Sequence, residues 1–371
     1  MKFKIKQDIL LKNLNYISKA LTTKNIIPIL NGIKFEINKK ELIMIGSNDN
    51  IIIQSKIPLN KLEEITQEGS IIIPGIYILE IIKKLPNNII EIETDGTKII
   101  IKTKNSKYTL NGINISEYPD YNFNLIKNPI IIKQNDFKDL ITKTVFAISQ
   151  QEARPLLTGI NFKMENEKLT VLATDSYRLA QKTLILNNKN NQIIDIVIPG
   201  KNLIELTKIL NDDQENLELH LSNNNILFKF SNIIFQSRLL NGTYPHVSNQ
   251  IPQDFSIEIE VIGNELYNII DRASLLTENE KNTLHLEINN DNLIITSDAL
   301  EVGKVEERMK IINKNKKNIK LSFNSKFMMD ALKSLTTEKI LILLNQEKPP
   351  IILKEINNND ILQLILPIKT F

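Results

Sequence analysis

Few residues in this chain have the types and spacing that chemistry needs. The histidines, His220, His246 and His285, have no second histidine or paired carboxylate at metal-ligand spacing, and there is no cysteine. Gly200-Lys201 matches the end of a phosphate-binding loop, but the upstream glycine is missing and Asn202 stands where that loop has Ser or Thr. We therefore predict structural or surface histidines, no metal, no cofactor and no nucleoside triphosphate site.

The most polar recurring segment is Ala173-Thr174-Asp175-Ser176-Tyr177-Arg178-Leu179. An enzyme would use Asp175 as a base or a metal ligand. Asp49 and Asp298 hold equivalent places elsewhere in the chain, which favours a repeated turn in which Asp caps backbone N–H groups. Because no triad, acid-base pair or glycine-rich cradle remains, we predict no catalytic residues and no enzyme.

Lysines recur seven positions apart, a spacing that places both on one face of a helix. They fall opposite the apolar stripe in each third of the chain, as Lys12 and Lys19, Lys201 and Lys208, and Lys326 and Lys333, with Lys83 and Lys84 on a further helix. The stretches read as helices carry eleven bases against six acids, although the whole chain has 46 against 43. The plain alternative is a solvated helix face. Recurrence favours attraction to nucleic-acid phosphates without reading of base edges.

These segments belong to an internal repeat. Ile27–Phe35 returns as Arg154–Phe162, Ile73-Pro74-Gly75 as Ile198-Pro199-Gly200, and Tyr118-Pro119 as Tyr244-Pro245, all at offsets of 125 to 127 positions. Ser47-Asn48-Asp49 recurs as Ala173-Thr174-Asp175 and again, 123 positions further, as Thr296-Ser297-Asp298. We therefore predict three copies, as domains 1–126, 127–252 and 253–371, with boundaries near Asn124–Asn128 and Gln250–Asp254.

Each copy follows the order helix, strands, helix, strands. The first helix spans about Gln7 to Leu21, with counterparts near Asn135 and Gly263, and second helices start at Gly75, Gly200 and Ser325. Strands are predicted at Gly32–Ile37 and Glu41–Ile45, joined by a hairpin at Asn38-Lys39-Lys40, and at Ile89–Glu93, Lys98–Thr103 and Lys107–Asn111. This order predicts an α+β fold with antiparallel meanders and argues against a parallel sheet.

The composition indicates the cellular compartment of the protein. The chain is 42% hydrophobic and 24% charged, lacks cysteine, and has no apolar run long enough for a membrane span. Met1 to Leu10 lacks the apolar stretch of a signal peptide. We expect a cytoplasmic protein without membrane contact.

Several motifs, in order and at family spacing, resemble the β subunit of bacterial DNA polymerase III, the sliding-clamp family. They are Met1-Lys2-Phe3, Pro28-Ile29-Leu30, Ala173–Ala180, Ile198-Pro199-Gly200-Lys201, Asn241-Gly242-Thr243-Tyr244-Pro245 and Leu364–Phe371. The resemblance covers the whole chain. It implies three similar domains per chain and two chains closed head to tail into a ring, with helices lining the bore.

The implied function is that of a processivity factor without enzymatic activity. A ring around duplex DNA tethers the replicative polymerase, because dissociation then becomes an intramolecular event at high effective concentration. Other implied partners are the clamp loader and further proteins with a clamp-binding motif. Positions that match family DNA contacts are Lys24, Gln151 and Lys201.

The resemblance also implies a pocket between the second and third domains that captures short peptides. Its matching residues are Leu157, Thr174, Ser176, Tyr177, Arg178, Leu179, Pro245, Pro350, Leu364, Ile365, Leu366, Pro367 and Ile368. Asn249 and Gln250 stand where some relatives have a basic and an aliphatic pocket residue. The alternative reading of Leu364 to Leu366 is a buried closing strand.

For ring closure, the resemblance assigns Tyr108 and Leu110 to one side of a subunit interface and Leu275 and Leu276 to the other. Lys104 and Lys107 would face Glu301, Glu306 and Glu307 across it. Two other readings remain: a clamp-like scaffold that binds proteins but not DNA, and a nucleic-acid enzyme built on the repeat. The enzyme reading lacks catalytic groups.

Overall fold

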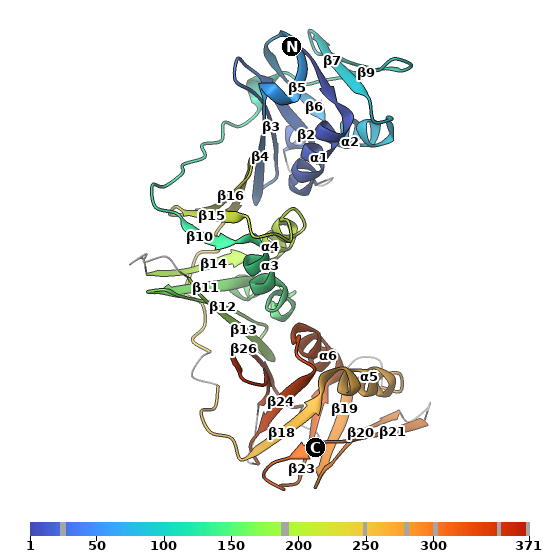
Figure 1. The fold of residues 1–371 in the computed structure, drawn as a ribbon, viewed down its shortest axis with the longest axis vertical. Helices are drawn as coiled ribbons and strands as arrows, with labels where there is room; N and C mark the ends of the chain where they lie inside the picture. Colours follow the sequence, from blue (N-terminus) through green and yellow to red (C-terminus); the bar gives the residue numbers. More distant parts are fainter. Residues whose placement is uncertain are drawn as a thin grey trace. The chain divides into compact units, whose positions relative to one another are not determined.

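The computed structural model describes residues 1–22, 27–186, 193–247, 251–277, 282–299, 303–346 and 350–368 (Figure 1). The chain divides into two compact units. Unit 1 comprises residues 1–136 and 202–239, and unit 2 comprises residues 137–201 and 240–371.

Each third of the chain contributes two α-helices to the described residues. Their bounds are α1 Gln7–Ile17, α2 Gly75–Lys84, α3 Gln134–Thr142, α4 Gly200–Thr207, α5 Gly263–Ser274 and α6 Ser325–Ser334. The predicted starts are confirmed to within one residue. The predicted end of the first helix at Leu21 is wrong, because α1 stops at Ile17 and a tighter 3-10 turn, η1 Ser18–Ala20, follows. There the Ser18 hydroxyl donates to the Asn15 carbonyl at 2.8 Å, a local bond that competes with the helical ladder.

Two of the second helices begin with glycine because nothing larger fits. A Cβ on Gly75 would lie 2.5 Å from Leu21 Cδ1 and 3.0 Å from the Asn31 carbonyl oxygen. On Gly200 it would lie 2.5 Å from Ile148 Cδ1 and 3.1 Å from the Thr158 carbonyl oxygen. Close packing therefore explains Gly200 without a bound phosphate.

Short 3-10 turns connect several elements. Their bounds are η2 Pro28–Asn31, η3 Leu59–Lys61, η4 Ile115–Glu117, η5 Val145–Ala147 and η6 Pro155–Thr158.

Unit 1 contains two antiparallel sheets. The first, in the order β5-β1-β7-β8-β9, consists of Leu62–Gln67, Lys2–Lys6, Ile89–Asp95, Lys98–Lys102 and Lys107–Asn111. The second, in the order β10-β15-β16-β17-β4-β3-β2-β6, consists of Ile130–Lys133, Asn216–Leu221, Asn225–Phe230, Ile233–Arg238, Ile51–Pro58, Glu41–Ser47, Gly32–Ile37 and Gly69–Pro74. Because β17 pairs with β4, this sheet joins strands of the first and second copies.

Unit 2 repeats this arrangement. Its larger sheet, in the order β14-β11-β12-β13-β26-β25-β24-β18-β22, consists of Ile194–Pro199, Gly159–Glu165, Lys168–Thr174, Arg178–Ile185, Asn358–Ile365, Ile351–Glu355, Lys339–Leu344, Ile257–Ile262 and Ile312–Asn313. Its smaller sheet, β21-β20-β19-β23, consists of Gly303–Lys310, Asn292–Ala299, Thr283–Asn289 and Ile319–Asn324. Here β13 of the second copy pairs with β26 of the third.

Buried and more exposed side chains alternate along the strands, as expected for sheets with one buried face. In β18, Ile257, Ile259 and Val261 are buried, while Glu258 and Glu260 between them are only partly covered. The buried face packs with residues of α5 and α6 into the core of the third copy. All paired strands with a described register are antiparallel, so the predicted α+β fold of three helix-strand repeats is confirmed.

Candidate functional site

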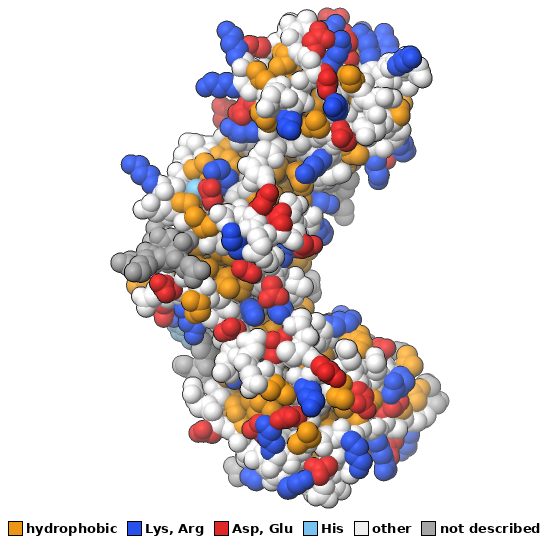
Figure 2. Space-filling view, in the orientation of Figure 1, with side chains coloured by type: hydrophobic (Ala, Val, Ile, Leu, Met, Phe, Trp, Pro, Cys, Tyr) orange, Lys and Arg blue, Asp and Glu red, His pale blue; other side chains and the backbone are white. Residues whose placement is uncertain are grey.

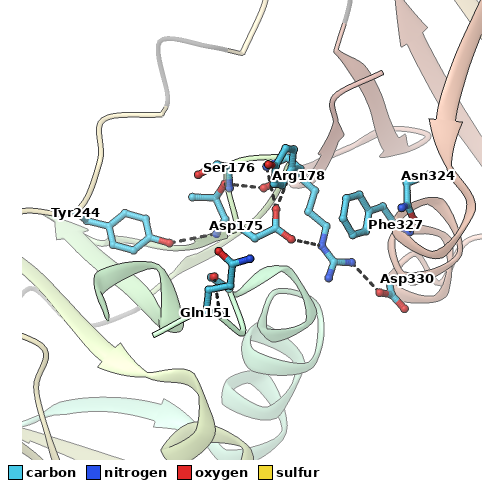
Figure 3. A network of polar contacts seen from close by, with 11 residues as sticks. Gln151, Asp175, Ser176, Arg178, Tyr244, Asn324, Phe327 and Asp330 are labelled. Atoms are coloured by element: carbon cyan, nitrogen blue, oxygen red, sulfur yellow. Dashed lines mark hydrogen bonds and ion pairs between the residues drawn. The ribbon is translucent and has the colours of Figure 1, made fainter. Parts of the chain in front are cut away.

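The recurring polar segment forms a tight turn between β12 and β13 (Figure 3). Asp175 Oδ1 accepts hydrogen bonds from the backbone N–H of Tyr177 at 2.9 Å and of Arg178 at 3.0 Å. Thr174 Oγ1 donates to the Arg178 carbonyl at 2.6 Å, and Ser176 has a positive φ of 79°. Asp175 is therefore the backbone cap that the sequence predicts.

Contrary to expectation, the two equivalent aspartates accept no capping hydrogen bond from the backbone of the described residues. In the first copy the cap is Asn48, whose Oδ1 accepts from the N–H groups of Asn50 and Ile51 at 2.9 Å each, while Asp49 is exposed. Asp298 lies inside β20 and pairs with Lys304 across the hairpin at 2.5 Å. The capped turn therefore occurs in both the first and the second copy, with Asn48 and Asp175 as the caps, because Asn and Asp side chains have the same short acceptor geometry.

A pocket of about 450 Å³ opens beside the Asp175 turn, and we call it the peptide pocket. Its lining residues are Arg154, Pro155, Leu156, Leu157, Thr174, Ser176, Pro245 and Val247. Four of these were assigned from the sequence, namely Leu157, Thr174, Ser176 and Pro245. The walls are mainly aliphatic and proline, with hydroxyl groups on one side, which suits an extended peptide with apolar anchors.

Hydrogen bonds hold the rim of the peptide pocket in place. Arg154 Nη1 donates to Ser176 Oγ at 3.0 Å. The buried Tyr244 hydroxyl accepts from the backbone N–H of Thr174 at 3.1 Å. Burial raises the pKa of Tyr244 well above its ordinary value, so the ring stays neutral at physiological pH.

Sequence reasoning missed Arg154, Pro155, Leu156 and Val247 as pocket residues. The signal was present, because Arg154-Pro155-Leu156 directly precedes Leu157 in the repeat motif and Val247 lies two positions after Pro245. The chain bends through η6 at this point, so adjacent side chains face one cavity rather than alternating as in a strand.

Below the pocket lies an apolar cluster that includes Leu157, Leu179 and Leu364. The last two are 4% and 5% exposed, so they support the pocket from the core. Leu366 is 38% exposed, and its backbone N–H donates to the carbonyl of Tyr177, itself 65% exposed, at 2.9 Å. The closing-strand reading therefore holds for Leu364 and ends at Leu366.

Two assigned side chains point to the opposite face of the sheet. Arg178 and Ile365 are directly paired in the β13–β26 ladder, next to the Leu179 and Leu364 pair, and successive strand residues alternate in direction. Ile365 is 1% exposed and belongs to the core of the third copy. The side chains of Arg178 and Ile365 therefore do not line the peptide pocket.

The remaining assigned positions lie outside the lining of this pocket. Pro350 and Pro367 are partly exposed, and the Ile368 N–H donates to the Ser322 carbonyl at 2.8 Å. Asn249 and Gln250 fall outside the described residues.

Arg178 links the Asp175 turn to α6 (Figure 3). Its Nε donates to Asp175 Oδ2 at 3.0 Å and its Nη1 to Asp330 Oδ2 at 2.7 Å. The guanidinium carbon lies 4.3 Å from the ring centroid of Phe327 and 5.5 Å from that of Phe146. With a side chain only 10% exposed, Arg178 is a largely buried cation between two carboxylates and two rings.

Arg178→Ala should destabilise unit 2 by roughly 3–5 kcal/mol, because it leaves Asp175 and Asp330 without their cation. The stability of Arg178→Lys should lie between that of Arg178→Ala and that of the wild type, since lysine keeps the charge but not the forked geometry. Urea unfolding followed by circular dichroism measures the change, and hydrogen exchange of α6 and the Asp175 turn should localise it.

Lys163→Ala is the matched control, because Lys163 makes an exposed ion pair with Glu165 at 2.8 Å. The urea concentration at the unfolding midpoint of Lys163→Ala should equal that of the wild type. A wild-type midpoint for Arg178→Ala would show that the network contributes nothing to stability.

The predicted DNA-facing lysines lie mostly on or beside the helices. Lys12, Lys83, Lys84, Lys201, Lys208, Lys326 and Lys333 are exposed, whereas Lys19 is half-buried on η1. Lys208 follows α4 and contacts Glu205 at 2.5 Å, and Lys84 lies 3.7 Å from Glu80. Interaction with Tyr267, whose ring centroid lies 5.1 Å from the ammonium, raises the pKa of Lys333. Gln151 is exposed, and Lys24 lies outside the described residues.

The predicted excess of bases on the helices is wrong. Within the bounds of the six described α-helices there are eight bases and eight acids. Lys19, Lys143 and Lys208 fall just beyond helix ends, and Asp8 and Asp136 occupy first turns, where the helix dipole favours acids. Acidic side chains lie among the basic ones on the face in Figure 2. A DNA-binding role must therefore depend on where individual lysines project.

The assigned interface residues lie at sheet edges and at a helix end. Tyr108, 39% exposed, and the partly exposed Leu110 are on β9, an edge strand. Leu275, 80% exposed, and the partly exposed Leu276 follow α5. Glu307 is held by Arg272 at 2.8 Å and Glu306 by Arg308 at 2.5 Å, while Glu301 lies outside the described residues. The expected ion pairs of Lys104 and Lys107 would have to compete with these contacts.

The histidines have structural or surface positions. His220 is 2% exposed, with Nδ1 accepting from the Ile126 N–H at 3.0 Å and Nε2 3.0 Å from Glu218 Oε2. His285 Nδ1 lies 2.8 Å from Ser322 Oγ, and His246 is exposed. Among the described residues, no three His, Asp or Glu side chains are grouped as a metal site requires. No helix in those same residue ranges is long and apolar enough to cross a membrane.

Comparison with known proteins agrees with the threefold architecture. Models of the DNA polymerase III beta subunit match residues 1–122 as its N-terminal domain, 131–246 as its central domain and 249–369 as its C-terminal domain. The beta sliding clamp of Staphylococcus epidermidis is 36% identical over 377 residues, covering all of both chains. The crystal structure of the DNA polymerase sliding clamp from Bacillus subtilis covers both chains fully, with 37% identity and a TM-score of 0.96. The DNA polymerase III beta chain of Streptococcus pneumoniae gives 33% identity and a TM-score of 0.95, again over both full chains.

The fold and the three matched domains together define a three-domain clamp. The chain belongs to the DNA polymerase III beta subunit family, the sliding clamps. It is accordingly a non-catalytic accessory subunit of the polymerase and acts as a processivity factor in DNA replication.

Proposed function

We propose that two copies of this chain close head to tail into a ring around duplex DNA and recruit proteins through the peptide pocket. The partners are the replicative polymerase, the clamp loader and other proteins that carry a clamp-binding motif. The observation that carries the proposal is the aliphatic pocket of about 450 Å³ beside a turn fixed by Asp175 and Arg178. The proposal includes domain boundaries at 126/127 and 252/253 and a cytoplasmic location.

The peptide-binding part of the proposal rests on shape and polarity. Leu156, Leu157 and Val247 offer apolar subsites, while Thr174 and Ser176 stand at the rim. Tyr177 and Leu366 are exposed and joined through the backbone bond from the Leu366 N–H to the Tyr177 carbonyl. An extended peptide with a glutamine and two or three apolar anchors fits this surface.

The DNA-binding part rests on exposed lysines in all three copies. Lys12, Lys201 and Lys326 project from helices that carry no set of side chains suited to base edges. Contacts of this kind engage phosphates without reading sequence, so a ring held by them remains free to move along the duplex.

Reversing Lys12, Lys19, Lys201 and Lys208 to Glu should reduce loading onto DNA and sliding while folding is retained. These charges contribute phosphate contacts, whose strength falls steeply with salt because counterions are released. The measurement is retention of the loaded protein on closed circular DNA, and its release after the circle is cut, at increasing salt concentrations.

A variant with Lys39, Lys40, Lys98 and Lys168 changed to Glu is the matched control, since these exposed lysines lie on hairpins of the sheets. It should load like the wild type. Release from circular DNA before cutting would contradict the ring, and tight, salt-insensitive binding to one DNA sequence would contradict the phosphate contacts.

A further inference from the structure

Unit 1 contains a second pocket, of about 330 Å³, which we call the first-copy pocket. One wall comes from the first copy of the repeat and is lined by Ile27, Leu30, Asn48, Asp49, Asn50, Ile52, Pro119 and Tyr121. The opposite wall comes from β16 and β17 and includes Asn225, Gln236 and Arg238.

The first wall is the repeat equivalent of the peptide pocket. Six of its eight lining residues stand 126 or 127 positions before Arg154, Leu157, Thr174, Ser176, Pro245 and Val247, which all line the peptide pocket. The other two, Asp49 and Ile52, have counterparts that do not line it. Both pockets thus use the same three chain segments: the stretch at the 3-10 turn, the tip of a β-hairpin, and the segment from the proline to the residue two positions after it. The offset changes by only one residue, from 127 at the 3-10 turn to 126 at the other two segments, so the agreement follows from the repeat.

The surrounding structure is repeated as well. Asn48 caps the hairpin turn in the first copy as Asp175 does in the second. The buried Tyr118 donates to the Ile45 carbonyl at 3.2 Å, and its counterpart Tyr244 bonds the backbone at Thr174. The far wall stands on β17, which pairs with β4 as β26 pairs with β13 beside the peptide pocket.

The far wall gives the first-copy pocket a different chemistry. Arg238 is exposed, and among the described residues its guanidinium has no hydrogen bond or ion pair. Asn225 lies directly opposite Arg238 in the β16–β17 ladder and adds an amide to the same wall. On the other wall, the Tyr121 hydroxyl donates to Ser47 Oγ at 2.7 Å, which fixes the ring as an apolar surface. Asp49 also lines the pocket, so an anionic group fits only on the Arg238 side.

We propose that the first-copy pocket is a second peptide-binding site, which takes an extended segment with an apolar anchor and a carboxylate that pairs with Arg238. The anchor contacts Leu30, Pro119 and the Tyr121 ring, and the forked guanidinium holds the carboxylate. The inference rests on the proposed function, because the peptide pocket is the repeat counterpart of the first-copy pocket. The ligand is an extended peptide because the wall that the two pockets share has the same chain geometry.

The test uses the full chain and fluorescein-labelled Gln-Leu-Ala-Leu-Phe, either with a free C-terminal carboxylate or as the amide. Calorimetric titration of the free acid should give two sites per chain, and titration of the amide should show one of the two weakened about tenfold or more. Arg238→Glu should weaken that same site tenfold or more and leave the other unchanged, because charge-assisted pairs are the strong hydrogen bonds.

Lys40→Glu is the matched control in unit 1. It lies just before β3, whereas Asn48 follows the end of this seven-residue strand, roughly 26 Å away at about 3.3 Å per residue. Its titration should equal that of the wild type. A photoreactive leucine in the same peptide should label residues 27–30, 48–52 or 119–121, which locates the site independently of any variant.

The outcomes separate this proposal from that for the peptide pocket. One site per chain, unaffected by Arg238→Glu and with no labelling of the first-copy pocket, overturns the second site and leaves the peptide pocket intact. Loss of the Arg238-independent site in Leu156→Ala assigns that site to the peptide pocket. If Leu156→Ala changes nothing while Arg238→Glu acts as expected, the proposed peptide pocket fails and the first-copy site stands.

Discussion

Replacing Leu275 and Leu276 by lysine should convert the ring dimer into folded monomers. Leu275 is 80% exposed in the single chain, directly after α5, and buries no core surface that the substitution would disturb. Burial of each leucine in an interface contributes about 1.5–3 kcal/mol, so the loss of both raises the dimer dissociation constant roughly a hundredfold or more. Analytical ultracentrifugation at micromolar concentration measures the change.

The reason to expect an interface here is a pair of open sheet edges. β9 ends the five-stranded sheet and β21 ends the four-stranded sheet, each with one unpaired side among the described strands. Unpaired edges near an exposed and a partly exposed leucine promote association, and a head-to-tail contact between two different edges closes into a ring.

Ile185→Lys with Ile193→Lys is the control for the interface, because these isoleucines are 59% and 82% exposed and belong to the β13 and β14 region. This variant should remain dimeric. A wild-type protein that sediments as a monomer, or a Leu275/Leu276 variant that stays dimeric, would show that the chains meet elsewhere.

The fold could be predicted from the sequence to a large extent because the repeat supplies independent agreement. Gly75 and Gly200 mark second helices in two copies, and Ser325 stands at the same place in the third. In the first two copies this glycine packs against a neighbouring 3-10 turn where a larger side chain would not fit, so its position is the same in both. What the sequence does not reveal is that the middle copy divides its strands between two sheets, since β17 and β13 pair with strands of other copies.

The site was predictable in its location and less so in its side chains. Thr174 and Pro245 lie in motifs, so resemblance places them correctly at the pocket. The direction of Arg178 depends on strand alternation and on Asp330, which is 152 positions away in sequence. The predicted excess of bases on the helices was wrong for a similar reason. A shift of one or two residues at a helix end excludes Lys143 or Lys208 and includes an acid of the first turn.

The peptide pocket should lose affinity about tenfold or more when Leu366 or Leu156 is changed to alanine. Leu156 lines the pocket, Leu366 is 38% exposed beside Tyr177, and truncating an anchor contact costs about 1–2 kcal/mol or more. The backbone bond from Leu366 to Tyr177 survives the substitution, so the loss reports side-chain contact with the peptide. Titration with an amidated fluorescent peptide carrying glutamine and aliphatic or aromatic anchors measures it.

Leu179→Ala would be a poor test of the same pocket, because Leu179 is 4% exposed in the apolar cluster and its truncation costs about 2–5 kcal/mol of stability. Leu125→Ala is the suitable control, since this leucine is 45% exposed and lies in unit 1. It should bind the peptide like the wild type. If Leu156→Ala and Leu366→Ala both keep wild-type affinity with their unfolding midpoints unchanged, partner peptides bind on another surface of the chain.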